Sequence, residues 1–123
     1  MPVRLLLDTN VVLGLLKNTG DIGRLEELQA VSSDECAYSS ITRIELLGFH
    51  GISENEDGII RNVLNRFHYL AVTRQIEDIA IEIRRQSKTV KLPDALIMAT
   101  ARAHGIRLVT LDEDLKRLNA HIS

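Results

Sequence analysis

The sequence predicts an α/β domain whose central sheet is mostly parallel. Short apolar runs that suit buried strands alternate along the chain with longer segments that repeat apolar residues at helical spacing. Clusters of glycine and small polar residues separate these segments, as turns do. The chain has 123 residues, and no internal repeat or low-complexity linker interrupts it. We therefore expect a single domain over residues 1–123.

The composition is that of an ordinary globular protein. Hydrophobic residues make up 45% of the chain and charged residues 26%, which is not the composition of a disordered tail. Aromatic residues make up only 3%, so base-stacking platforms are not expected to be the main binding device. The formal net charge of −2 neither demands nor excludes a nucleic-acid partner.

The cellular location is predicted from three absences in the sequence. Cys36 is the sole cysteine, so an internal disulfide cannot form. No apolar run approaches the length that spans a bilayer, which predicts no membrane association. The N-terminal apolar run is too short for a signal peptide, and Asp8 interrupts it. We expect a cytoplasmic protein.

The first half of the chain predicts two strands and three helices. Apolar runs indicate the strands, and apolar residues at helical spacing indicate the helices. In order they are a strand over 3–7, a helix over 9–18, a helix capped by Asp21 that contains Ile22, Leu25 and Leu28, a strand over 35–39 and a helix over 40–49.

The second half continues the alternation. The helix over 94–104 is apolar nearly all round, so we expect it to be central and buried, with Pro93 at its start and Gly105 at its end. The other expected elements are a helix with an acidic first turn at 53–57 and the apolar stripe Ile60, Val63, Leu64 and Phe67, a strand over 69–72, a helix capped by Thr73, a strand over 107–110, a short helix after Asp112 and an edge strand in the last residues.

Asp8 is the residue around which the predicted chemistry is organised. It ends the strand over 3–7, and the helix over 9–18 follows at once. In open α/β sheets, ligands bind at the edge that the carboxyl ends of the strands form, which makes Asp8 a candidate site residue. Taken alone, the same stretch is explained equally well by Asp8 capping the next helix.

Three further acids stand out by their context. Asp94 begins the buried helix, Asp112 follows the strand that ends in Thr110, and Glu45 lies within an apolar stretch of the helix over 40–49. Each has an ordinary alternative: a first-turn acid, a turn or cap residue, or a side chain that faces water. Their agreement in position weakens these alternatives, because such places share one edge of a parallel sheet.

Carboxylates gathered at that edge predict a metal site. Four of them would raise one another's pKa unless a cation lay among them. The chain has no His and Cys set with zinc spacing, and an all-oxygen ligand set favours Mg²⁺ or Mn²⁺, as one or two ions. Such ions support the hydrolysis of phosphodiester bonds. Because all four acids are expected at this edge, we expect Asp8 to point at the ion and Thr9 or Asn10 to cap the helix.

Four segments of the chain, taken in order, resemble the PIN-domain ribonucleases. They are L-L-L-D-T-N-V-V-L, S-S-I-T-R-I-E-L-L-G, K-L-P-D-A-L-I-M-A-T-A and L-V-T-L-D-E-D-L, and with their intervals they extend over nearly the whole chain. Within the family, the sequence is similar to the VapC-type toxins of bacterial and archaeal toxin–antitoxin pairs. The resemblance implies a PIN-like three-layer sandwich, with helices flanking the mostly parallel sheet.

The resemblance also implies roles for the acids. Asp8, Glu45 and Asp94 would bind the ion that activates the attacking water. Asp112 would complete the site directly, through water, or around a second ion, and Asp114 is its alternative in the D-E-D cluster. No nucleophilic Ser or Cys is required, and the product would carry a 5′-phosphate.

Supporting residues follow from the same comparison. Thr110 matches the family's small polar residue after the last strand and would hydrogen-bond a carboxylate or a water on the ion. Thr9 and Asn10 match the residues that follow the first acid. Leu115 departs from the family, which often has an aromatic residue after the last acidic cluster.

The resemblance implies three partners: an RNA substrate, a small VapB-like antitoxin protein that covers a hydrophobic groove, and a second copy of the chain in a homodimer. Basic residues near the acids are candidate phosphate contacts, and such contacts would make binding sensitive to salt. Each of them taken singly is more simply a solvated surface residue. These residues are Arg43, Arg84, Arg85, Lys88 and Lys91.

Two alternatives to the ribonuclease stay open. A haloacid-dehalogenase-like phosphatase also begins with an apolar strand followed by an acid, but it needs a second Asp two residues on, where this chain has Asn10. The other alternative is a non-catalytic PIN-like module that binds RNA or a partner. The presence of all four acids argues against a decayed site.

Overall fold

The computed structural model describes residues 2–18 and 25–121, and its centre is a parallel β-sheet. In this part of the chain the sheet has four strands in the order β3-β2-β1-β4, and each pairing is parallel. This confirms the predicted α/β class. The strands are β1 (Leu5–Leu7), β2 (Cys36–Ser39), β3 (His68–Leu70) and β4 (Arg107–Val109).

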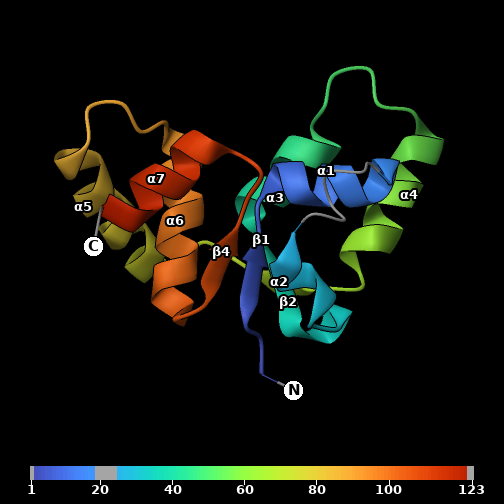
Figure 1. The fold of residues 1–123 in the computed structure, drawn as a ribbon. Coiled ribbons are helices and arrows are strands. Elements are labelled where there is room, and N and C mark those ends of the chain that lie inside the picture. The colour runs from blue at the N-terminus through green and yellow to red at the C-terminus, as the bar shows by residue number, and fades with distance from the viewer. Residues whose placement is uncertain (1, 19–24, 122–123) are drawn as a thin grey trace.

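Helices lie on both sides of the sheet and give the molecule three layers (Figure 1). One group comprises α1 (Thr9–Lys17), α2 (Glu26–Gln29), α3 (Ser40–Leu47) and α4 (Glu54–Leu64), to the right of the strands in Figure 1. The other group, to the left, comprises α5 (Arg74–Gln86), α6 (Leu92–His104) and α7 (Glu113–His121).

Strand β1 shows why its sequence is apolar without a break. Leu5 and Leu7 pack into the core formed with α1, α3 and α4, whereas Leu6 packs into the core formed with α6. Successive side chains of a strand point to opposite faces, so a strand covered on both faces needs apolar residues at every position. All three leucines are accordingly buried.

Helix α6 is the central helix that its composition predicts. Six of its residues are buried, from Ala95 to Ala101, and they pack against α5, α7 and the sheet. The helix starts at Leu92, so Pro93 is its second residue. Gly105 ends the helix with a positive φ of 63°, a conformation that glycine adopts without steric cost.

Three expectations need correction or lie outside the described residues. The last described residues form α7, which extends to His121, and not the expected edge strand, because Leu115 and Leu118 pack against α5 and α6 at helical spacing. Strand β2 starts one residue late, because Glu35 closes a short 3₁₀ helix (Ser33–Glu35). The cap expected at Asp21 lies outside the described residues.

None of the helices in the described ranges has the combination of length and apolar character that crossing a lipid bilayer requires.

Candidate active site

The site is built at the carboxyl edge of the sheet, where β1 and β4 end side by side. The backbone N–H of Asp8 donates to the carbonyl of Val109 at 2.9 Å, which ties the two strand ends together. The Thr110 hydroxyl then donates to Oδ2 of Asp8 at 2.6 Å. Both residues are buried, so this contact fixes a carboxylate that has little access to water. Thr110 thus makes the carboxylate contact expected of it.

Asn10 fixes the direction of that hydrogen bond. Its Nδ2 donates to the Thr110 hydroxyl oxygen at 3.3 Å, and the backbone N–H of Asp112 donates to the same oxygen at 3.1 Å. Because both of these groups are donors, the single hydroxyl hydrogen of Thr110 is left for Asp8. The Oδ1 of Asn10 also accepts from the backbone N–H of Leu111 at 3.1 Å, so Asn10 holds the loop after β4 against α1.

A second chain of hydroxyl groups holds Glu45. The Thr9 hydroxyl donates to Oε1 of Glu45 at 2.7 Å, and its oxygen lies 3.0 Å from the hydroxyl of Thr42. Since the Thr9 hydrogen is engaged by Glu45, Thr42 is the donor in the second contact. Thr42 is fully buried, whereas Glu45 is exposed. Glu45 therefore faces water, which was the alternative considered for it from the sequence. Its carboxylate is nevertheless held by the hydrogen bond from Thr9, the residue that follows Asp8.

Asp94 lies in the first turn of α6 and is half-buried. Burial raises the pKa of its carboxyl group, and the negative charges of Asp8, Asp112 and Glu45 raise it further, against a smaller opposing effect of Lys91. The pKa of Asp8 is also raised, chiefly by burial. Hydrogen bonds from Thr110 and Thr9 partly offset this effect, while Glu45 and Asp112 add to it. The structure thus brings the four predicted acids close enough to repel one another.

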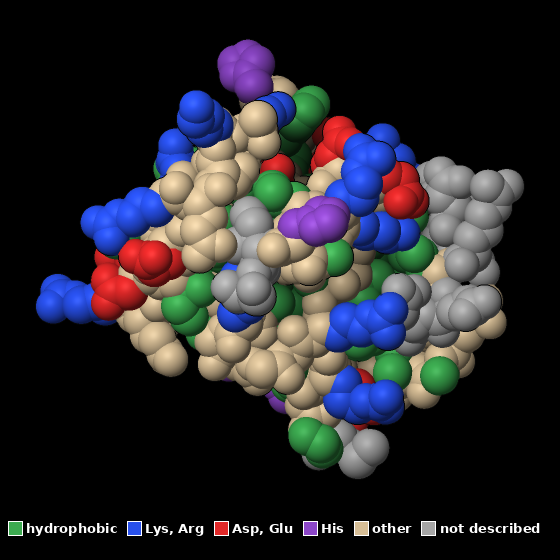
Figure 2. Space-filling view, turned by 60° about the vertical axis from the view of Figure 1, so that its left-hand side comes forward, with side chains coloured by type: hydrophobic (Ala, Val, Ile, Leu, Met, Phe, Trp, Pro, Cys, Tyr) green, Lys and Arg blue, Asp and Glu red, His purple; other side chains and the backbone are tan. Residues whose placement is uncertain are grey.

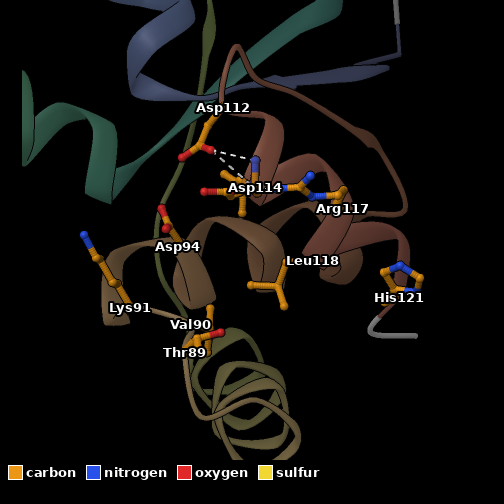
Figure 3. A pocket seen from close by; sticks show the side chains of 10 residues that line it. Thr89, Val90, Lys91, Asp94, Asp112, Asp114, Arg117, Leu118 and His121 are labelled. Atoms are coloured by element: carbon orange, nitrogen blue, oxygen red, sulfur yellow. Dashed lines mark hydrogen bonds and ion pairs between the residues drawn. The ribbon is translucent and has the colours of Figure 1, made fainter.

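Asp112 and Asp114 take different positions. Asp112 is exposed, and its Oδ1 accepts from the backbone N–H groups of Asp114 and Leu115, so it caps α7. Its charge also raises the pKa of both Asp8 and Asp94. The carboxylate of Asp114 instead forms an ion pair with Arg117 (Figure 3). This contrast favours Asp112 as the fourth acid, although it is a cap residue as well.

The helix cap at the other end of the site differs from the expectation. Asp8 itself is the N-cap residue of α1, and its Oδ1 accepts from the backbone N–H of Thr9 at 2.8 Å. The expectation that Thr9 or Asn10 would cap the helix was wrong, because their side chains are engaged by Glu45 and by the loop after β4. From the sequence, capping the next helix and serving as a site residue were alternative roles for Asp8. The geometry is compatible with both roles at once.

The donor set fits a hard divalent cation. Four carboxylates from the start of α1, α3, α6 and the start of α7 supply only oxygen, and their mutual repulsion is what a bound cation relieves. Among the described residues, no three His, Cys, Asp or Glu side chains are already drawn together as a ligand set. The fit therefore rests on ligand chemistry and electrostatics.

The predicted basic residues do not act as one group. Lys91 lies beside Asp94 (Figure 3), whereas Arg85 forms an ion pair with Glu82 on the exposed side of α5. Arg43, Arg84 and Lys88 are exposed and do not line the pocket at Asp94 and Asp112. Figure 2 shows Lys and Arg side chains in several separate groups on one face, with acids among them. No continuous basic patch is visible on that face.

Sequence reasoning missed three residues of this region. Thr42 was not singled out, because nothing in its local sequence distinguishes a buried threonine that contacts another hydroxyl from an ordinary helical one. Arg117 and His121 line a pocket of about 500 Å³ together with Asp94 and Asp112 (Figure 3). Their helical spacing to Asp114 places them on the same side of α7, a signal that the sequence did contain.

Comparisons with known proteins identify the family and the fold. The model of the PIN domain family matches residues 5–120. A chain of a toxin–antitoxin complex from Klebsiella pneumoniae is 27% identical, with a TM-score of 0.75 over 89% of this chain and 87% of that one. VapBC2 from Rickettsia felis, in a complex with a promoter DNA fragment, has a chain that is 21% identical, with a TM-score of 0.76 over 94% and 93% of the two chains.

FitAcB from Neisseria gonorrhoeae contains a chain that is 24% identical, with a TM-score of 0.77 over 95% of this chain and 94% of that one. The likenesses to the Rickettsia and Neisseria chains concern the fold. A search of curated proteins finds no match. Because the family model covers nearly the whole chain, including all four acids, this protein belongs to the PIN domain family.

Proposed function

We propose that this protein is a Mg²⁺- or Mn²⁺-dependent endoribonuclease and the toxin of a type II toxin–antitoxin pair. The observation that carries the proposal is the convergence of Asp8, Glu45, Asp94 and Asp112 at one edge of the sheet. There the charges of the other three acids raise the pKa of Asp94, and those of Glu45 and Asp112 also raise the pKa of Asp8. Family membership supports the coarser part, because PIN-domain toxins are generally nucleases. The dependence on a metal ion and the choice of RNA as the substrate go beyond what family membership supports.

The side chains of the site have two roles: some would bind the cation, and others position the residues that bind it. Asp8, Glu45 and Asp94 would bind the ion, and Asp112 would complete the site directly or through water. A divalent ion in such a site lowers the pKa of a water molecule and neutralises charge on a phosphate. Thr110 keeps Asp8 in place through its donated hydrogen bond, and Thr9 does the same for Glu45. These contacts restrict each carboxylate before any ligand binds.

RNA cleavage by the purified chain tests the proposal. Wild type should cleave RNA with Mg²⁺ or Mn²⁺ and lose this activity in EDTA, and Asp8→Ala and Asp94→Ala should each lose at least about 100-fold, the size expected for a catalytic carboxylate. Asp78→Ala is the matched control, because Asp78 is an exposed acid on α5 outside the site. Unchanged cleavage in both Ala variants would overturn the proposal.

The phosphatase alternative has little support in the geometry. It requires an acid two residues after Asp8, but Asn10 stands there and both ends of its amide are engaged by Thr110 and Leu111. Detection of an aspartyl-phosphate on Asp8 by mass spectrometry would revive this alternative. A non-catalytic module would show no Mg²⁺ or Mn²⁺ binding that depends on Asp8 and Asp94 in calorimetry.

The partner proposals rest on the toxin–antitoxin complexes to which the chain is similar. We expect a small VapB-like antitoxin to bind the toxin, and the toxin to form a homodimer. Exposed apolar side chains on and next to α3 offer a surface for one of these contacts: Ile44 is 63% exposed and Phe49 is 71% exposed. Co-purification with the small protein encoded next to it, with Ile44→Glu as the variant, tests the antitoxin contact. Light scattering tests the dimer.

A further inference from the structure

A pocket of about 500 Å³ extends from Asp94 and Asp112, two of the four site acids, along the gap between the start of α6 and α7 (Figure 3). Asp94 and Asp112 face each other at one end of it, and His121 lies farther along. The pocket is therefore continuous with the candidate active site. Its volume lies within the range of sites that bind small organic ligands.

The inner wall of the pocket is apolar and firmly packed. Val90 is 7% exposed and Leu115 is 2% exposed, because both belong to the core shared by α5, α6 and α7. Leu118 is partly buried against the same core and lies in the middle of the pocket. A wall of core residues is present before a ligand arrives, and it offers an apolar surface to one flat face of a ligand. The lining contains no aromatic side chain other than the imidazole of His121 among the described residues.

The rim of the pocket carries cationic groups on two elements. Lys91 is the N-cap residue of α6 and lies beside Asp94, where its charge lowers the pKa of that carboxyl group. Arg117 comes from α7 and forms an ion pair with Asp114. Both side chains are largely exposed, so their charges are available at the mouth. Apolar wall, acidic end and cationic rim together suit a ligand that is part flat and apolar and part anionic.

We propose that this pocket is the subsite for one unpaired nucleotide of the RNA, next to the phosphate that is cleaved. The inference rests on the proposed function, because it takes the scissile phosphate to lie at Asp94 and Asp112. The base would contact Val90 and Leu118, and the flanking phosphates would contact Lys91 and Arg117. A base within a duplex is stacked and paired and cannot enter such a pocket, so the subsite selects single-stranded RNA.

Binding of a short fluorescein-labelled single-stranded RNA to the full-length Asp8→Asn chain in Mg²⁺ tests the rim. Lys91→Gln and Arg117→Gln should each weaken binding about 5-fold and lower the salt slope by about 0.7, the value for one phosphate contact with a single strand. Lys116→Gln is the matched control, since it removes the same charge from a nearby exposed position outside the pocket lining.

Asp114 provides a test of opposite sign. Because Arg117 is paired with Asp114, a phosphate must compete with that carboxylate for the guanidinium group. Asp114→Asn should therefore strengthen RNA binding about 3-fold, as removal of one negative charge from a phosphate contact does. If Asp114 instead served as the fourth metal ligand, the same variant would weaken both Mg²⁺ binding and RNA cleavage, which would contradict this assignment.

Filling the pocket tests the base contact. Thr89 lines the pocket and is exposed, so Thr89→Trp should occlude it without disturbing the core, and it should raise KM for single-stranded RNA about 10-fold in the otherwise wild-type chain. Gln86→Trp places the same ring at a nearby exposed and uncharged position outside the lining, and should leave KM within about 2-fold. Circular dichroism confirms that both variants fold.

The outcomes separate this inference from the proposed function. Cleavage that depends on Asp8 and Asp94, with pocket variants that behave like their controls, would overturn the subsite and leave the ribonuclease intact. RNA binding that responds to the pocket variants, without any cleavage by wild type, would support the subsite and overturn the ribonuclease. Equal affinity for the single strand and its duplex, or an effect confined to binding of a partner protein, would also contradict the subsite.

Discussion

The hydroxyl of Thr110 donates a hydrogen bond to Oδ2 of Asp8 at 2.6 Å, although the two residues lie 102 positions apart in the chain. This contact joins the ends of β1 and β4 and holds a buried carboxylate beside three others. Burial and repulsion alone would push Asp8 toward its neutral form, and the donated hydrogen bond opposes them. The relationship explains how the fold accommodates the buried carboxylate of Asp8 beside other acids.

Removing this hydroxyl should cost both stability and activity. In Thr110→Val, Asp8 loses its donor, and Asn10 and the Asp112 N–H lose their acceptor, so we expect a loss of about 1–3 kcal/mol in the free energy of unfolding. Urea unfolding measures this change. Thr110→Ser keeps the hydroxyl and should recover most of the loss, whereas equal stability of the Val variant and wild type would show that the contact is dispensable.

Thr42 should affect metal binding from a position that is out of reach of the ion. Thr42→Val removes the donor to Thr9 while nearly conserving volume, so Thr9 holds Glu45 less firmly. We expect Mn²⁺ affinity to fall about 10-fold, as is common for residues that orient metal ligands. Calorimetry measures the affinity, and Thr42→Ser is the control that should restore it. A Val variant with normal affinity would limit Thr42 to packing.

Neutralising Asp94 should stabilise the protein in EDTA. The pKa of Asp94 is raised in the folded state, so its charged form costs stability above the unfolded-state pKa. Asp94→Asn should therefore raise Tm at pH 7, and thermal unfolding followed by circular dichroism measures this change.

The sign of this effect reverses with metal and vanishes in acid. Well below pH 3.8, the ordinary pKa of an aspartate side chain, Asp94 is protonated in both states, and wild type and Asp94→Asn should have the same Tm. Saturating Mn²⁺ should raise the Tm of wild type but not that of the variant, because a ligand stabilises only the form that binds it. A variant that is less stable than wild type in EDTA at pH 7 would contradict the described electrostatics.

Glu35 gives a pH dependence of opposite sign, away from the site. Its pKa is lowered, first by the backbone N–H of Ser32 and then by Arg4, with which it forms an ion pair at 3.0 Å. The stability that Glu35 contributes is therefore present above the unfolded-state pKa near 4.5 and is lost as pH falls through the lower folded-state value. Glu35→Gln should be less stable than wild type at pH 7, and the difference should shrink in acid titrations followed by circular dichroism.

Local pattern predicted the fold, which the structure confirms, and it also selected the four acids, because both inferences depend on short-range signals. The unbroken apolar run of β1 predicts a strand buried on both faces, and the apolar circumference of α6 predicts a central helix. Asp8 and Asp112 were chosen as candidates because they follow such strands. What lies at a strand's carboxyl edge follows from topology, once the sheet is known to be parallel.

The remaining features depend on contacts between distant parts of the chain. Thr42 reaches Glu45 only through Thr9, which lies 33 positions before it, and no local pattern reports such a contact. Asp114 differs from Asp112 because it forms an ion pair with Arg117, and this pair depends on how the side chains of α7 are arranged. The same limit explains why helix capping and a site role were alternatives for Asp8. The two roles are compatible because Oδ1 accepts from the Thr9 N–H while Oδ2 accepts from the Thr110 hydroxyl, and the sequence does not show this.

Sequencing of RNA ends after brief expression tests the central claim most directly. Wild type should produce new ends, with 5′-phosphates, at discrete positions in unpaired RNA. Asp8→Asn, which keeps the shape of the side chain but removes the charge, should produce none of them. The same set of new ends in both samples, or no new ends in wild type, would contradict the assignment of Asp8 and its three neighbouring acids as a metal-dependent ribonuclease site.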